Sequence, residues 1–104
     1  MTTGQTFPQV FKLTGEVDLA RQAELDEIEA AAAQVEFATV DLTEVTFLDS
    51  TALKWLLSIK RALDGKNGRL RLLACSGTVT RVLSLAGLED VFETIVVGQG
   101  PAES

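Results

Sequence analysis

Strand-like and helix-like segments alternate along this chain, and that alternation leaves few folds open to it. Short β-branched or apolar runs are separated by longer segments whose apolar residues recur every three or four positions. The expected strands are residues 10–13, 37–42, 69–75 and 94–97, and the expected helices are residues 19–35, 51–63 and about 77–86. This order predicts an α/β fold with a mostly parallel, four- to five-stranded sheet, right-handed crossovers and helices packed against the sheet.

Capping and turn residues predict where several helices and strands begin or end. Gly87 suits the left-handed position after the last turn of the third helix, where Leu88 would contact Leu83. The expected turns or strand ends are Thr14-Gly15, Thr43-Glu44 and Gly65-Lys66-Asn67-Gly68. The expected helix N-caps are Asp18, Ser76 and a residue of the segment Asp49-Ser50-Thr51.

The apolar spacing also predicts a core. One stripe of the first helix and several residues of the later elements are expected to be buried together: Leu25, Ile28, Ala32, Val35, Phe47, Leu53, Leu56, Val82 and Leu83. With 104 residues, the chain has the length of a single small domain. We expect that domain to span residues 1–104, with its core at about 9–97 and flexible tails at 1–6 and 98–104.

Composition excludes several functions. A net charge of −6 makes nucleic acid an unfavourable partner, and a chain without histidine lacks the commonest general base and metal ligand. There is no phosphate-binding loop of the Gly-x-x-x-x-Gly-Lys-Ser/Thr type, so nucleotide hydrolysis is not expected. Cys75, the one cysteine, is expected to be a buried, inert thiol. No long apolar run or signal peptide is found, so a cytoplasmic protein is expected.

Three polar motifs follow three of the predicted strands. They are Thr14-Gly15-Glu16-Val17-Asp18, Phe47-Leu48-Asp49-Ser50-Thr51 and Cys75-Ser76-Gly77-Thr78. Each has a simple structural interpretation, as a helix cap or a turn. Because the carboxyl ends of parallel strands meet at one edge of a sheet, where ligands and partners tend to bind, the three motifs are expected to cluster in space.

These segments, in this order, resemble the STAS domains of anti-sigma factor antagonists. The resemblance rests on Leu13-Thr14-Gly15-Glu16-Val17-Asp18 and on Leu48-Asp49-Ser50-Thr51-Ala52-Leu53 at a helix start. It continues through Gly68-Arg69-Leu70-Arg71-Leu72, Val79-Thr80-Arg81-Val82-Leu83 and Ala86-Gly87-Leu88, and covers about residues 9–97. Two departures stand out: many members have glycine where this chain has Ala52, and residues 98–104 offer no counterpart of a C-terminal helix common in the family.

The resemblance implies a regulatory protein, not an enzyme, with a STAS fold. Its partner would be an anti-sigma factor that is also a serine kinase, and binding by the unphosphorylated form would free a sigma factor for transcription. Phosphorylation at Ser50, or alternatively at Thr51, would abolish binding. The kinase would bring ATP and magnesium, so neither a cofactor nor a metal is expected of this chain, which would be a monomer or a weak dimer.

The expected partner-binding residues are Asp18, Asp49, Ser50, Thr51, Lys54 and Trp55. Two alternatives stay open at this stage. Trp55 is either packed under the sheet or partly exposed as a contact anchor. The domain as a whole is either an antagonist or the cytoplasmic STAS subunit of a bacterial lipid-transport system, docked on and bracing the transporter's ATPase, with no insertion into the membrane.

Overall fold

Four parallel strands and three α-helices alternate in the structure, a computed structural model that describes residues 9–99. The sheet has the order β1-β2-β3-β4, and each neighbouring pair is parallel, as the alternation predicts. In chain order the elements are β1 (Gln9–Val17), the 3₁₀ helix η1 (Leu19–Arg21), α1 (Gln22–Ala32), β2 (Phe37–Leu48), α2 (Ser50–Asp64), β3 (Arg69–Ser76), α3 (Thr78–Leu85) and β4 (Glu93–Gln99).

The first two strands are longer than predicted, because the expected breaks are bulges. Thr14-Gly15 does not end β1, and Thr43-Glu44 is not a turn. Lys12 pairs with Asp41 but Thr14 pairs with Glu44, so β2 holds one extra residue at this point. The Asp41 carboxylate accepts hydrogen bonds from the amide of Thr43, at 2.9 Å, and from its hydroxyl, at 2.7 Å. Residues typical of turns therefore form a bulge within a continuous strand.

A second register shift overturns one core prediction. Gly15 pairs with Val45, and the next pair is Glu16 with Phe47, so Thr46 is the extra residue. A one-residue shift reverses the face of every side chain that follows it. Phe47, expected in the core, is accordingly 45% exposed.

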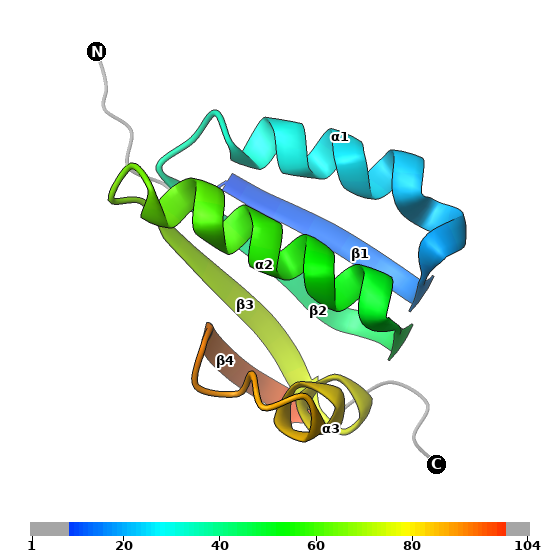
Figure 1. Ribbon diagram of the computed structural model, residues 1–104. Helices are drawn as coiled ribbons and strands as arrows, with labels where there is room; N and C mark the ends of the chain where they lie inside the picture. The colour runs from blue at the N-terminus through cyan, green and yellow to red at the C-terminus, as the bar shows by residue number, and fades with distance from the viewer. Residues whose placement is uncertain (1–8, 100–104) are drawn as a thin grey trace.

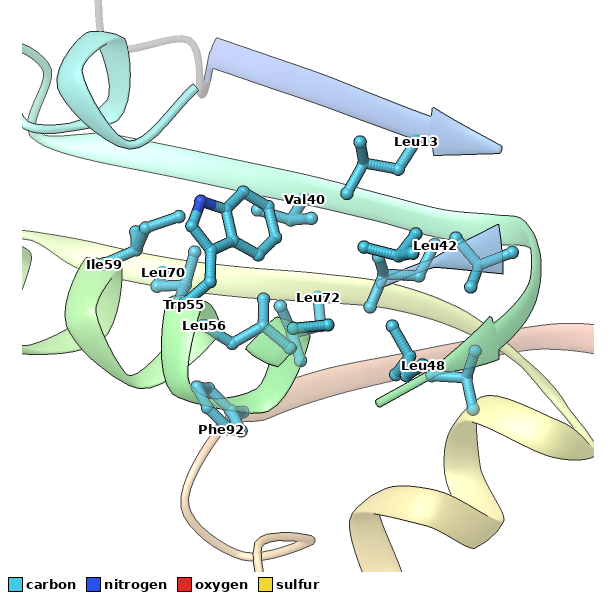
Figure 2. Packing of buried hydrophobic residues seen from close by; sticks show 14 of the residues in the cluster. Leu13, Val40, Leu42, Leu48, Trp55, Leu56, Ile59, Leu70, Leu72 and Phe92 are labelled. Atoms are coloured by element: carbon cyan, nitrogen blue, oxygen red, sulfur yellow. The ribbon is translucent and has the colours of Figure 1, made fainter. Parts of the chain in front are cut away.

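The core lies between the sheet and its helices. Helices α1 and α2 cover one face of the sheet, with α3 beside β2 and β3 (Figure 1). Leu56 and Leu83 are buried as predicted, and so are Leu25 and Ala32 of the predicted stripe. The other predicted core residues are partly buried against the same cluster: Ile28, Val35, Leu53 and Val82. Figure 2 shows Leu56 and Trp55 reaching from α2 toward Val40 and Leu72 of the sheet.

Helix α3 begins at a different cap from the predicted one and ends as predicted. Ser76 is not its N-cap, because β3 continues through that residue and the cap is Gly77, at φ 130°. The Gly77 amide donates to the Thr80 hydroxyl at 3.1 Å. The predicted C-terminus is confirmed: Gly87 has φ 75°, and the Leu88 amide donates to the Leu83 carbonyl at 2.8 Å.

Two elements end at positions other than those predicted. Residues 98 and 99 belong to β4, so the tail expected from residue 98 is wrong for these two positions. Residues 1–6 and 100–104 lie outside the described part of the chain. Helix α1 ends at Ala32, three residues earlier than predicted.

Candidate functional site

Two of the three polar motifs meet at the carboxyl end of the sheet. The amide of Asp49 donates a hydrogen bond to the carbonyl of Val17 at 3.3 Å. This contact extends the β1–β2 pairing past the end of β2, whose last residue, Leu48, pairs with Val17. Asp18 and Asp49 therefore leave neighbouring strands side by side.

Both aspartates are helix caps. Asp18 Oδ1 accepts from the amide of Ala20 at 3.1 Å, and Asp49 Oδ1 accepts from the amide of Ala52 at the same distance. Asp49 has extended backbone angles, φ −111° and ψ −173°, and α2 begins at the next residue. Of the three predicted capping residues 49–51, Asp49 is thus the N-cap, and Ser50 is the first residue of the helix.

Ser50 is exposed, whereas Thr51 is partly buried. Thr51 and Lys54 line an open groove of about 310 Å³ between α1 and α2, together with Gln22, Glu29, Trp55 and Ser58. The hydroxyl at residue 50 is therefore the more accessible of the two acceptor candidates. Lys54 is exposed at the rim of the same groove.

Trp55 has a structural role. Its side chain is only 3% exposed, and its indole Nε1 donates to the carbonyl of Leu25 at 2.7 Å, which ties α2 to α1. Of the two alternatives for Trp55, the packed one is correct. The expectation that Trp55 anchors a partner is wrong, because a buried ring offers no surface to another protein.

The third motif ends β3 and leads into α3, which lies beside β2 and β3. The pairing of β2 with β3 runs only from Phe37–Arg69 to Asp41–Leu73, so the strands separate well before β2 ends. The Cys75 Sγ lies 3.5 Å from the carbonyl oxygen of Thr43, beside the middle of β2. Cys75 is partly buried there, and not fully buried as expected. A direct hydrogen bond therefore confirms that the first two motifs meet, whereas the third is placed by β3 and α3.

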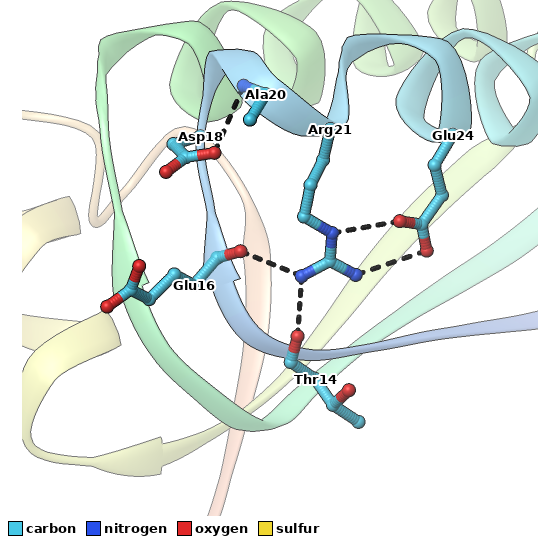
Figure 3. Close-up of polar contacts among 6 residues, drawn as sticks. All are labelled: Thr14, Glu16, Asp18, Ala20, Arg21 and Glu24. Atoms are coloured by element: carbon cyan, nitrogen blue, oxygen red, sulfur yellow. Dashed lines mark hydrogen bonds and ion pairs between the residues drawn. The ribbon is translucent and has the colours of Figure 1, made fainter.

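Arg21 is a site residue that the sequence did not reveal. Its Nη1 donates to the carbonyls of Thr14, at 2.6 Å, and Glu16, at 2.7 Å, while its Nε donates to Glu24 at 2.8 Å (Figure 3). The hydrogen bond to Glu24 raises the pKa of Arg21, and the bond from Arg21 lowers the pKa of Glu24. Arg21 thereby fixes the β1 end against the start of α1, next to Asp18.

Two exposed apolar residues flank the aspartates. Leu19 directly follows Asp18 and is 66% exposed, and Phe47 lies two residues before Asp49. An isolated exposed leucine is common on protein surfaces. A second apolar side chain at the same end of the sheet adds contact area for a protein partner. The Leu19 exposure could have been suspected from its place outside the stripe of α1, whereas the exposure of Phe47 depends on the bulge.

The two carboxylates near Ser50 serve the backbone, because Asp18 and Asp49 each accept an amide hydrogen bond as a helix cap. Within residues 9–99, no group of three or more potential metal-ligating side chains comes together. In the same part of the chain, no helix has the length and apolar character needed to span a bilayer.

Comparisons with known proteins agree on one family. The family model described as "Mlab, STAS domain" matches residues 2–97. A STAS-domain containing protein of Pseudomonas aeruginosa (strain UCBPP-PA14) is 37% identical over 54 residues, which are 52% of this chain and 54% of that protein. The match thus spans about half the length of that relative. The solved structure of the anti-sigma factor antagonist SpoIIAA in its unphosphorylated form has a TM-score of 0.71 and 26% identity, and the match covers 89% of this chain and 85% of SpoIIAA.

Proposed function

The chain belongs to the STAS domain family, and from that membership we propose that it is an anti-sigma factor antagonist. In this proposal its unphosphorylated form binds an anti-sigma serine kinase in the cytoplasm and frees a sigma factor for transcription. Phosphorylation of Ser50 ends the binding. The similarity in fold to SpoIIAA, an anti-sigma factor antagonist solved in an unphosphorylated form, supports this proposal.

The observation that carries the proposal is the position of Ser50. It is exposed, it is the first residue of α2, and it directly follows the capping Asp49. A kinase that reaches this hydroxyl transfers the γ-phosphoryl group of ATP to Oγ, and ADP leaves. A phosphate here is tolerated by the fold, because a helix N-terminus favours negative charge.

The same phosphate is unfavourable for a docked partner. It brings a charge of about −1.5 to −2 to a surface that already holds Asp18 and Asp49. A partner that docks over Ser50 would have to bury this charge, at a cost in desolvation and repulsion. The proposed docking surface consists of Asp18, Asp49, Ser50, Thr51, Lys54 and the exposed face of α2, flanked by Leu19 and Phe47.

The test uses an anti-sigma serine kinase encoded in the same genome as this chain. With ATP and magnesium, mass spectrometry of the parent should find one phosphate on Ser50, and Ser50→Ala should bind the kinase but accept no phosphate there. Thr51→Ala is the matched control and should be phosphorylated like the parent. If Ser50→Ala were phosphorylated stoichiometrically and Thr51→Ala were not, the acceptor would be Thr51.

A charge substitution separates binding from folding. Ser50→Asp adds about one negative charge, so it should weaken the complex, though less than true phosphorylation does. Its melting temperature should change by less than about 4 °C, because the position is exposed and a carboxylate suits the first turn of a helix. The loss of affinity should shrink as salt rises from low to moderate concentration. A folded Ser50→Asp variant that binds as tightly as the parent would refute the switch.

A second candidate function is kept because the matching family model is described as Mlab and not as an antagonist. In this alternative the domain is a cytoplasmic STAS subunit that docks on the ATPase of a bacterial lipid-transport system and braces it. Affinity capture from extract of the source cells distinguishes the two. Recovery of a serine kinase supports the antagonist, and recovery of a transporter ATPase, unaffected by Ser50→Asp, supports the alternative.

A further inference from the structure

Lys54 is a free positive charge close to the proposed phosphorylation site. Its side chain is exposed, and within residues 9–99 it forms no ion pair. Lys60, on the same helix, differs in this respect, because it pairs with Asp64 at 2.9 Å. Lys54 is therefore available to an acidic group that is added nearby.

Ser50 and Lys54 lie one turn apart on α2. Both belong to the helix, which spans Ser50–Asp64, and both side chains are exposed. Residues four positions apart share one face of a helix, with about 5–6 Å between their Cβ atoms. An acidic group that precedes a lysine by four positions has the favoured orientation for a helical ion pair. A phosphate on Ser50 would thus come within reach of the Lys54 ammonium.

The other basic residues of α2 cannot take the place of Lys54. Lys60 and Arg61 follow Ser50 by ten and eleven positions, which is about 15–17 Å along the helix axis. Arg21, at the start of α1, is already held by Glu24 and by two backbone carbonyls of β1. Lys54 is thus the basic side chain that the spacing favours.

The surroundings of Ser50 are acidic. Asp49 directly precedes it, and Asp18 is the neighbouring cap. Glu29 lines the groove between α1 and α2 that Lys54 also lines (Figure 1). No ion pair joins Lys54 to any of these carboxylates, so the lysine would not have to leave a partner. A phosphate carries a charge of about −1.5 to −2 and attracts a lysine more strongly than a single carboxylate does.

We propose that Lys54 binds the phosphate of phosphorylated Ser50 in an intramolecular ion pair along α2. This inference rests on the proposed modification of Ser50. The pair would offset part of the charge that the phosphate adds beside Asp18 and Asp49, and it would hold the phosphate against the helix. It would also draw Lys54 away from the groove between α1 and α2. Lys54 is thus a positioning residue for the phosphate.

Protein with phosphoserine installed at residue 50 during translation tests the pair without a kinase. Phosphorus NMR at low salt follows the second ionisation of the phosphate. Its pKa should be lower in the parent than in Lys54→Gln, because a nearby cation favours the doubly charged form. The neighbouring carboxylates of Asp18, Asp49 and Glu29 are the same in both proteins. Lys54→Arg keeps the positive charge and should restore the lower pKa.

Melting temperatures give a second measurement. The change in melting temperature that the phosphate causes should be more favourable in the parent than in Lys54→Gln, by about 1–4 °C. Without phosphate the two proteins should melt alike, because Lys54 then has no partner to lose. Arg61→Gln is the matched control, since it removes an exposed charge from the same helix beyond the reach of Ser50. It should behave like the parent in both measurements.

Two outcomes would overturn the proposal. One is a phosphate whose pKa and effect on melting are the same in the parent and in Lys54→Gln, and the other is an equal change in Arg61→Gln. Failure here is separate from failure of the proposed function. If the pair forms but no anti-sigma kinase binds the chain, the function alone is refuted. If the kinase phosphorylates Ser50 but the phosphate is insensitive to Lys54, the ion pair alone is refuted.

Discussion

Leu56→Ala tests the packing on which the whole arrangement depends. Leu56 is fully buried, at 0% exposure, on the face of α2 that meets the sheet (Figure 2). The substitution removes three carbon groups at roughly 0.8 kcal/mol each, about 2.4 kcal/mol in transfer energy. The unfilled cavity adds to this, so the expected loss is about 2–5 kcal/mol. A domain of this length has a total stability of about 5–15 kcal/mol, so a large share of it is at stake.

Urea unfolding measures this loss. Fluorescence of Trp55, the one tryptophan, follows the packing of α2 directly. With a urea dependence of about 1–1.5 kcal/mol per molar, a loss of about 2–5 kcal/mol should lower the midpoint by about 1.3–5 M. Leu85→Ala is the control, because Leu85 is 81% exposed and its truncation should cost less than about 0.5 kcal/mol. A loss for Leu56→Ala as small as that of the control would show that α2 packs by another face.

Two further predictions concern the ends of the sheet. Because Arg21 lowers the pKa of Glu24, the ionised pair stabilises the fold fully above the carboxyl's ordinary pKa, and that stabilisation is lost as pH falls through the folded-state pKa. The free energy of unfolding should therefore be higher for the parent than for Glu24→Gln at pH 6–7, by less than about 1 kcal/mol since the pair is largely exposed. The two should converge as pH falls below the folded-state pKa of Glu24. Gly68→Ala should cost at least about 1–3 kcal/mol in urea unfolding, because an added Cβ would lie 2.6 Å from a backbone carbonyl oxygen. Gly65→Ala, whose nearest such contact is 3.4 Å, should stay within about 0.5 kcal/mol, and equal losses would contradict the steric reasoning.

Local patterns predicted much of the fold. Segments with strand-like spacing of apolar residues alternate with segments of helix-like spacing, and this alternation predicted the element order and the parallel sheet. A buried helix face and a buried strand each have their own apolar spacing in the sequence. The C-terminus of α3 was predictable for a similar reason, because it depends on neighbouring residues. Gly87 and the hydrogen bond from the Leu88 amide to the Leu83 carbonyl all lie within six consecutive residues.

Features that depend on pairing between distant residues were not predictable in this way. The two bulges of β2 follow from its register with β1, and they turn Phe47 outward although its neighbours suggest a core residue. Arg21 and Trp55 act through backbone carbonyls seven and thirty positions away. A side chain that bonds to a backbone carbonyl leaves no compositional mark at the acceptor, because every residue has one. The sequence thus predicted that Asp18 and Asp49 meet at the carboxyl edge of the sheet, as they do, whereas Trp55 was assigned to the proposed contact surface and lies in the core.

The identity of the cap matters for the proposed switch. If Ser50 were the N-cap, its hydroxyl would accept a hydrogen bond from the helix backbone, and modifying it would disturb a contact worth about 1 kcal/mol. Phosphorylation would then alter folding and binding together. In the structure Asp49 accepts that bond, from the amide of Ala52, and the exposed Ser50 follows it in the first turn of the helix. A phosphate on Ser50 would meet the positive end of the helix while the cap stays in place. The adjacent aspartate thus allows a charge to be added at the proposed docking surface with little change in the stability of the domain.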